Sequence, residues 1–292
     1  MAPHGLSRPP GPVQRQPPPA FHDVRRADLC TGTLELLFTT GADQWVSPGS
    51  GRLTLTENDQ GEVVAQEAAR RNGRPVLPGS GIKGAVRTVY ELLSFSCDPF
   101  AREGCSASSC CDACSLFGCL GWAGRASFAD AAPVGSVQTL VAAVPIAHEP
   151  HGEKTGGQFR FYDLRDAAGL QGVPRDKELA REVYRGTFAG RLTFWNVSQE
   201  ELGRLLCAMG SGYVPAVRFP LRLGGVKYDG KGAVEVGFGA LALASPVRQS
   251  FARGEEVNEQ CSAWLQAAQS SPWGQTFRAT LESLARVLTT AA

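Results

Sequence analysis

The stretch Pro78-Gly-Ser-Gly-Ile-Lys-Gly-Ala-Val-Arg87 decides how the middle of this chain folds. Pro78 ends an extended run, Gly79 and Gly81 permit a tight backbone, and Ser80 is a favourable N-cap. The apolar-periodic residues that follow predict an amphipathic helix from about residue 81 to residue 95. Lys83 and Arg87 lie four residues apart, so both project from one face of its first turns. A helix N-terminus beside two cations suits a phosphate group, although an ordinary loop-to-helix junction with solvated basic residues would have the same pattern.

A second glycine-rich segment runs from Gly224 to Gly232 between two strand-like stretches. Gly225, Lys227 and Lys231 again bring backbone N–H groups and positive charge together without bulk. Glycine is common at hairpin tips, so a plain hairpin is the alternative interpretation. Two basic glycine-rich segments in one chain favour a phosphate-binding surface more strongly than either does alone.

The cysteines are concentrated in one loop. Of nine cysteines, six fall between residues 97 and 119: Cys97, Cys105, Cys110, Cys111, Cys114 and Cys119. The Cys111-x-x-Cys114 spacing lets two thiolates reach one tetrahedral ion, and Cys97 and Cys105 supply the other two ligands from the preceding loop. We therefore expect a structural zinc ion that orders a loop with few packing residues of its own.

Other interpretations of the cysteine loop stay open at this point. Cys110 is an alternative ligand to Cys111, and His148 and His151 are more distant candidates. A redox Cys-x-x-Cys site is disfavoured because no strand leads directly into a helix at Cys111. An odd number of cysteines without an export signal predicts a cytoplasmic location and argues against a disulfide framework.

Composition limits the classes of function. The chain has 292 residues, 43% of them hydrophobic, and a net charge of +1, so any nucleic-acid binding must rest on local basic patches. No apolar run approaches the roughly 18 residues of a membrane span, and we expect no membrane partner. Residues 1–28 begin with a proline-rich stretch and predict a disordered or extended arm.

The predicted elements follow one another as strand, helix, strand, insertion, strand, helix and strand pair, which is an α+β, ferredoxin-like plan. Residues 41–74 are polar and are expected to form a long loop. Ser198-Gln-Glu-Glu201 is a capping box that predicts a further helix. The other expected elements are strands at 29–40, 124–128, 186–197, 219–223 and 233–238, and two helices within 255–290.

These pieces, in this order, resemble the RAMP superfamily of CRISPR effector subunits, most closely the backbone subunits of type III complexes. The resemblance rests on Asn72–Arg87, Cys111–Gly118, Gly124–Ala131 and the Gly224–Gly232 loop, and it covers most of residues 29–240. It implies an RRM-like core over 29–240 that carries the zinc loop (97–119) and a thumb-like insertion (133–185). Residues 1–28 and a C-terminal helical extension, 241–292, lie outside it.

The resemblance also implies a function in antiviral defence. Such subunits hold guide CRISPR RNA by its phosphate backbone, without reading its sequence, and meet complementary target RNA and other effector subunits. The RNA-binding residues implied by the motifs of this chain are Gly79, Ser80, Lys83, Arg87, Arg125, Gly225, Lys227 and Lys231.

One departure from the family pattern concerns cleavage of the target RNA. RNA-cleaving relatives carry an Asp in an Asp-x-Pro-Ile/Val context before the Pro-Gly-Ser, where this chain has Val63-Val64-Ala65-Gln66. Glu62 is the nearest acid that could hold Mg²⁺ or Mn²⁺ after a shift of one residue, and Asp59 and Glu67 are near it. We therefore favour a scaffold role and keep a metal-dependent endoribonuclease as the alternative. A guide-maturation nuclease is a weaker third hypothesis, because only Lys227 and Tyr228 are available beside the glycine-rich loop.

Overall fold

The computed structural model describes residues 4–19, 22–58, 61–98, 104–145, 158–164, 178–244 and 249–289. The strands of the central sheet are β3 (Cys30–Thr40), β4 (Gly49–Asn58), β5 (Gly61–Ala68), β11 (Ala126–Phe128), β12 (Ala132–Pro145), β14 (Glu178–Val197), β15 (Leu221–Arg222), β16 (Ala233–Ala244) and β17 (Gln249–Ala252). The helices are α1 (Gly79–Leu92), α2 (Asp112–Phe117), α3 (Gln199–Ala208), α4 (Glu255–Ser270) and α5 (Pro272–Thr289), with short 3₁₀ turns η1 (Pro215–Val217) and η2 (Lys227–Asp229).

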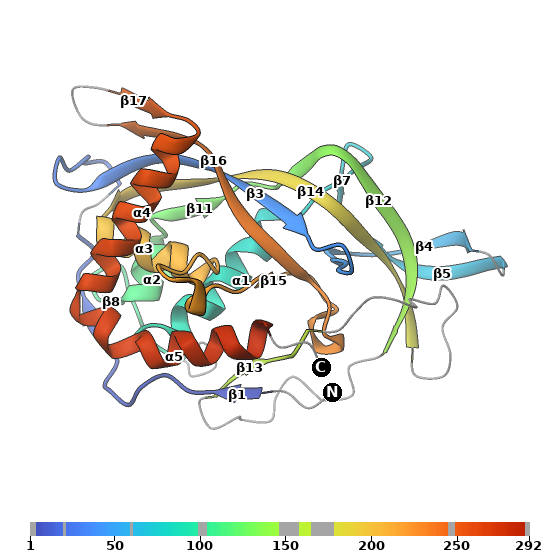
Figure 1. Ribbon diagram of the computed structural model, residues 1–292, viewed down its shortest axis with the longest axis horizontal. Helices are drawn as coiled ribbons and strands as arrows, with labels where there is room; N and C mark the ends of the chain where they lie inside the picture. The colour runs from blue at the N-terminus through green and yellow to red at the C-terminus, as the bar shows by residue number, and fades with distance from the viewer. Residues whose placement is uncertain are drawn as a thin grey trace.

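The sheet has the strand order β15-β16-β3-β14-β5-β4, with β11 and β12 also paired to β14 and β17 paired to β16. The pairs are antiparallel except β14 with β5. The sheet curls over a layer of helices that covers one of its faces (Figure 1). The predicted mixed α+β class with C-terminal helices is therefore confirmed. None of the described helices has both the length and the apolar character needed to cross a membrane.

Strand β3 shows why the helices lie on one face. Leu34, Leu36 and Phe38 are buried, whereas Glu35 and Thr39 are exposed. Successive side chains of a strand point to opposite faces of a sheet, so this alternation directs one face towards the helices and leaves the other open. The core accordingly lies between the sheet and the helix layer.

Close packing of helices completes this layer. The predicted capping box starts α3, with Ser198 and Glu201 each bonded to the other's backbone N–H. Gly203 then allows α3 to approach α4, because a Cβ at residue 203 would lie 2.0 Å from the carbonyl oxygen of Trp264. Trp273 of α5 donates a 2.5 Å hydrogen bond to the carbonyl of Leu93 and ties the last helix to the end of α1.

The prediction of a long loop over residues 41–74 is wrong. The segment contains the hairpin β4–β5, and then a second hairpin of β6 (Arg70–Arg71) and β7 (Arg74–Pro75) around a tight turn at Asn72 and Gly73, both with positive φ. The first hairpin projects from the body (Figure 1). Leu53 and Leu55 alternate with polar residues in β4, which is the pattern of a strand, but both are exposed and do not face the core.

The N-terminal arm is extended and packed on the domain. Its strand β1 (His4–Leu6) pairs with β13 (Phe159–Phe161), and β2 (Arg15–Gln16) pairs with β8 (Cys110–Cys111) of the cysteine loop. Further along the arm, His22 stacks on Trp122, at 4.8 Å between ring centroids. The described residues of the arm are therefore extended, which is one of the two forms that its composition allows.

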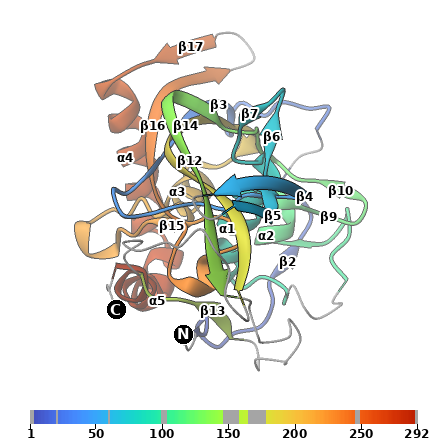
Figure 2. The same cartoon turned by 90° about the vertical axis from the view of Figure 1, so that its right-hand side faces the viewer.

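The insertion and the C-terminal region continue the sheet before they leave it. Strands β12 and β14 pair over most of their length and run together past the helix layer (Figure 2). Most of the expected thumb, residues 146–157 and 165–177, lies outside the described residues. At the other end of the chain, residues 241–244 still belong to β16 and residues 249–252 form β17, and the helices begin only at Glu255.

We predict that Gly203→Ala lowers the free energy of unfolding by about 1–3 kcal/mol, since its methyl group would meet the backbone of α4. Gly84→Ala is the matched control. No atom outside its own helix lies within 4 Å of a Cβ at residue 84, so this variant should gain about 0.5–1 kcal/mol from a better helix former. Urea unfolding measures both changes. Equal effects of the two variants would contradict the proposed contact between α3 and α4.

Candidate functional site

The N-terminus of α1 presents free backbone donors at the surface. The Gly79 N–H donates to Asp130 Oδ1 (2.9 Å), and the first intrahelical bond runs from Ile82 N–H to Pro78 O (3.0 Å). Between them Ser80 and Gly81 are exposed, and in the described part of the chain their N–H groups meet no acceptor. These two donors therefore point outward at the positive end of the helix dipole.

The helix begins two residues before the predicted start, and Ser80 is not its cap. Pro78 is the N-cap, without a side-chain hydrogen bond. Gly79 is buried, and a Cβ there would lie 2.1 Å from the carbonyl oxygen of Phe128. Gly79 therefore serves the packing of α1 on β11, and its N–H is already used by Asp130.

Lys83 and two glycines, Gly81 and Gly84, lie in the first turns of the same helix. Lys83 is half-buried, and among the described residues no acid lies within ion-pair distance of its ammonium group. Burial, and then the charge of Arg87, lower its pKa. Gly81 and Gly84 are exposed and have open space where a Cβ would stand. A glycine inside a helix costs up to about 1 kcal/mol relative to alanine, and no contact with the described residues explains that cost here.

Arg87 does not project freely beside Lys83. Its guanidinium donates to Glu91 Oε1 (2.7 Å), to the carbonyl of Gly118 (3.0 Å) and to the Sγ of Cys114 (3.5 Å). Glu91 is itself buried. Arg87 therefore joins α1 to the cysteine loop, and its charge is largely compensated within the protein.

The four cysteines predicted as metal ligands do come together. The Sγ atoms of Cys97, Cys105, Cys111 and Cys114 all lie within 4.8 Å of one another, and three of the four residues are buried. The Sγ of Cys97 is 3.6 Å from that of Cys111 and also from that of Cys114. Four converging sulfurs in a protein interior form a set that can hold a metal ion such as zinc.

The electrostatics of the cluster favour a cation. A hydrogen bond from Cys114 is the main reason why the pKa of Cys111 falls to about 4, whereas burial raises the pKa of Cys97 to about 12. The negative charge of one thiolate thus opposes the deprotonation of the next thiol in this mostly buried cluster. A divalent ion at the centre would lower the pKa of all four thiols.

Cys110 belongs to a different pair. Its Sγ donates to the carbonyl of Ser106 (2.7 Å) and lies 3.7 Å from the Sγ of Cys119. The structure thus selects Cys111 over Cys110 for the cluster. His148 and His151 lie outside the described residues.

The second glycine-rich loop joins the antiparallel pair β15 and β16, as the hairpin alternative predicts, and it is folded against the protein. The Gly225 N–H donates to the carbonyl of Ser47, and the Gly232 N–H to that of Trp45, both at 2.9 Å. Lys231 is only 8% exposed and forms an ion pair with Asp229. Lys227 lies in η2 and lines a small pocket, described below.

Sequence comparison adds a family to this geometry. A model of the RAMP superfamily matches residues 33–212, which include the sheet from β3 to β14 and helices α1 to α3. The chain belongs to the RAMP superfamily. RAMP proteins typically bind RNA and act in CRISPR complexes. No curated protein matches the chain.

Arg125 lies inside this RAMP domain and not on its surface. Its side chain is 1% exposed and forms an ion pair with Glu201 of the α3 capping box. It also donates to the carbonyl of Asn196 (2.7 Å) and to the Oγ of Ser115 (3.0 Å). Arg125 thus fastens the cysteine loop and α3 together, and we leave it out of the RNA-binding proposal.

Glu62 lies at the outer end of the β4–β5 hairpin, is exposed, and faces Glu57 in register across the strands. Strand β5 runs on from Glu62 to Ala68, a path of about 20 Å at 3.3 Å per residue. Asp59 lies outside the described residues. The Oε1 of Glu67 is 4.0 Å from the Nε of Arg70.

Metal binding should depend on the four clustered cysteines. We predict that Cys114→Ser loses a bound metal ion and lowers the unfolding temperature, because three sulfurs cannot complete a tetrahedral site. Cys110→Ser is the matched control and should keep the metal. Metal content per chain by mass spectrometry checks this. Retention of metal by Cys114→Ser, or its loss from Cys110→Ser, would contradict the assignment.

Arg125→Ala should lower the free energy of unfolding by about 3–5 kcal/mol, because it leaves the partly buried Glu201 carboxylate without its ion-pair partner. The control is Arg278→Ala, whose exposed pair with Glu282 (2.9 Å) should contribute at most about 1 kcal/mol. Burial raises the pKa of Glu201, but the charge and hydrogen bonds of Arg125 lower it further. The pair therefore stabilises the fold above the ordinary Glu pKa of about 4.3, and this contribution disappears as the pH falls through the lowered value. Urea unfolding at several pH values measures it.

Proposed function

We propose that this RAMP protein is a guide RNA-binding backbone subunit of a type III CRISPR RNA-guided complex that targets RNA in antiviral defence. The observation that carries the proposal is the exposed start of α1. The backbone N–H groups of Ser80 and Gly81 are free there, and Lys83 has no acidic partner among the described residues. Gly81 and Gly84 lie beside them, and no contact with the described residues requires a glycine at either position. The membership of a superfamily that typically binds RNA supports it.

The chemistry of this face suits the phosphate backbone of RNA. The Ser80 and Gly81 amides and the Lys83 ammonium are donors that bind phosphate oxygens and carry no information about the base. Gly81 and Gly84 leave the helix surface flat, so that a nucleic-acid backbone can approach closely. A subunit that holds guides of any sequence needs such sequence-independent contacts.

We further propose that the core is RRM-like, which means ferredoxin-like. The strand order β16-β3-β14-β11 and the helices α1 and α3 between successive strands support this. The paired strands β12 and β14 would form the base of a thumb over residues 133–185 that reaches the guide–target duplex.

The metal that we propose for Cys97, Cys105, Cys111 and Cys114 is a structural zinc ion. A ligand set of four sulfurs, mostly buried and all within 4.8 Å of one another, fits the tetrahedral preference of zinc. The ion would hold α2 and the cysteine loop in place. Arg87 would connect them to α1 through its bonds to Gly118 and Cys114. A cluster of free, mostly buried cysteines is compatible with a reducing cytoplasm, where we place the protein.

The proposed partners are guide RNA, complementary target RNA and neighbouring subunits of the complex. Leu53, Leu55 and Val64 support the last of these, since they are 70%, 61% and 57% exposed on the projecting β4–β5 hairpin. Leu55 and Val64 are directly paired across the strands. Exposed apolar residues gathered on one hairpin are typical of a protein–protein contact.

We do not extend the proposal to cleavage of the target RNA. Val63 occupies the position of the family's catalytic aspartate and offers no ligand for a metal ion. Glu62 lies at the hairpin tip, opposite Glu57 and at the far end of β5 from the second hairpin. The scaffold role therefore stays our proposal, and the endoribonuclease alternative gains no support from this geometry.

The proposal is tested by RNA binding of the purified chain. We predict that Gly84→Ala stabilises the protein yet weakens binding severalfold, because the methyl group occupies the space of the RNA backbone. Lys83→Ala should weaken binding of two unrelated RNA sequences alike and reduce the salt dependence of log Kd by about one. Fluorescence anisotropy over a range of salt concentrations measures both effects.

The control is Arg253→Ala, which removes an exposed cation from the turn between β17 and α4. Its RNA affinity should match that of the wild type. Unchanged affinity of both α1 variants would overturn the proposed binding face. A loss confined to one RNA sequence would show readout of bases and contradict backbone binding.

A further inference from the structure

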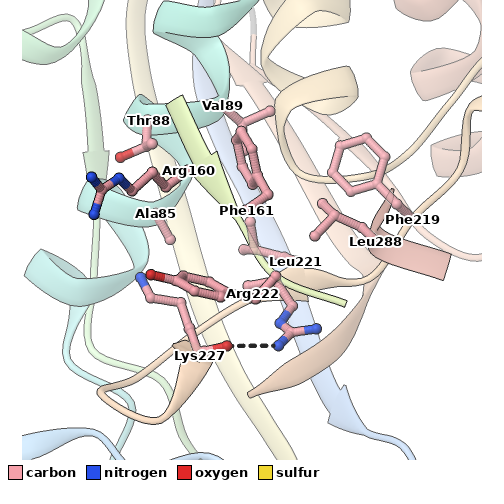
Figure 3. Close-up of a pocket in the computed structure, with 11 residues that line it drawn as sticks. Ala85, Thr88, Val89, Arg160, Phe161, Phe219, Leu221, Arg222, Lys227 and Leu288 are labelled. Carbon is pink, nitrogen blue, oxygen red and sulfur yellow. Dashed lines mark hydrogen bonds between the residues drawn. The ribbon is translucent and has the colours of Figure 1, made fainter. Parts of the chain in front are cut away.

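A small pocket lies beside α1, on the flank away from the cysteine cluster. It has a volume of about 80 Å³, and its walls come from α1, β13, β15, η2 and α5 (Figure 3). Much of the lining is apolar, including Phe161, Leu221 and Leu288. Three of the lining residues are nevertheless cationic: Arg160, Arg222 and Lys227.

Arg222 is the unusual member of this group. It is only 7% exposed, and its Nη2 donates to the carbonyl of Lys227 (3.2 Å). Its Nε and Nη1 are buried and have no hydrogen-bond partner among the described residues. A buried guanidinium with two unused donors is costly, because it has lost its water and gained little in return.

The acids near the pocket are engaged elsewhere. Asp163 is close enough to act on Arg222, but it pairs with His4 at 2.8 Å. Asp229 pairs with Lys231. Burial lowers the pKa of Arg222 to about 10, a fall that Asp163 only partly opposes. Burial, and then the charge of Arg222, lower the pKa of Lys227. Among the described residues, no acid forms an ion pair with Arg222 or Lys227, and Asp163 only partly offsets the charge of Arg222 from a distance.

We propose that this pocket binds a dianionic phosphate group, with Arg222 and Lys227 of its lining supplying the positive charge. Arginine matches the geometry of phosphate oxygens, and a free phosphate or a terminal phosphate monoester carries close to two negative charges near neutral pH. A carboxylate or an internal phosphodiester carries only one. A volume of about 80 Å³ is several times what one water molecule needs, so a group of a few atoms such as phosphate fits the pocket.

The phosphate can come from two sources, free phosphate or the end of an RNA strand. Ala85 and Thr88 of α1 line the pocket, one turn beyond the proposed RNA-binding face. A strand end that follows α1 could therefore reach it. The pocket is nevertheless built from other donors than that face, so the two proposals can be tested separately.

The test measures ligand binding by calorimetry and the unfolding temperature, both in phosphate-free buffer of low salt. Inorganic phosphate should bind the wild type saturably and raise its unfolding temperature, whereas acetate should not. Arg222→Met keeps the apolar stem and removes the charge, so it should weaken phosphate binding about tenfold or more. Lys227→Met should weaken it less. Arg253→Met, at an exposed arginine, is the matched control and should bind as the wild type does.

A second readout separates ligand binding from a structural role. Without phosphate, Arg222→Met should unfold at the same or a higher temperature than the wild type, because it removes an uncompensated buried charge. A lower unfolding temperature or failure to fold would show that Arg222 supports the fold and would overturn the proposal. Equal phosphate binding by wild type and Arg222→Met would also overturn it.

Two short RNAs distinguish the sources of phosphate. If the site takes a strand end, an oligonucleotide with a 5′- or 3′-phosphate should bind more tightly than its hydroxyl-ended form, and Arg222→Met should remove the difference. If the site takes free phosphate alone, inorganic phosphate binds and the RNA ends make no difference. Lys83→Ala should leave phosphate binding intact, so failure of the RNA-binding proposal and failure of this one give different results.

Discussion

The contact of Gly79 with the backbone of β11 determines where helix α1 begins, and most of the candidate site depends on it. Only a residue without a Cβ can sit against the carbonyl of Phe128. This contact brings the first N–H of the helix to Asp130 and turns the next two outward. It also sets the helix rotation that directs Arg87 to the cysteine cluster and leaves Ser80 and Gly84 exposed.

Glycines in this protein fall into two groups with different physical meaning. Gly79, Gly203 and Gly232 are needed because a Cβ would meet a backbone carbonyl of the same chain. Gly81 and Gly84 meet nothing within the chain, although each weakens its helix. The first group builds the fold, and the second is part of the basis for our proposal that RNA approaches this helix.

The cations divide in a similar way. Arg87, Arg125 and Lys231 have acidic partners in the protein and contribute to its stability. Among the described residues, Lys83 and the Nε and Nη1 atoms of Arg222 have none. Uncompensated charge is costly in a protein interior, so these positions, on two flanks of one helix, are where an anion would restore the balance.

The sequence alone determined the α+β class, the capping box of α3, the two C-terminal helices and the four cysteines that converge, because these depend on local spacing. It did not determine which cations are free. Arg125 and Glu201 are 76 residues apart, and nothing in the chain's local pattern indicates that they meet. The sequence also did not show that the apolar residues of the β4–β5 hairpin, Leu53, Leu55 and Val64, face outward. Only the tertiary structure decided these points, since long-range packing selects which charges are paired and which side chains stay exposed.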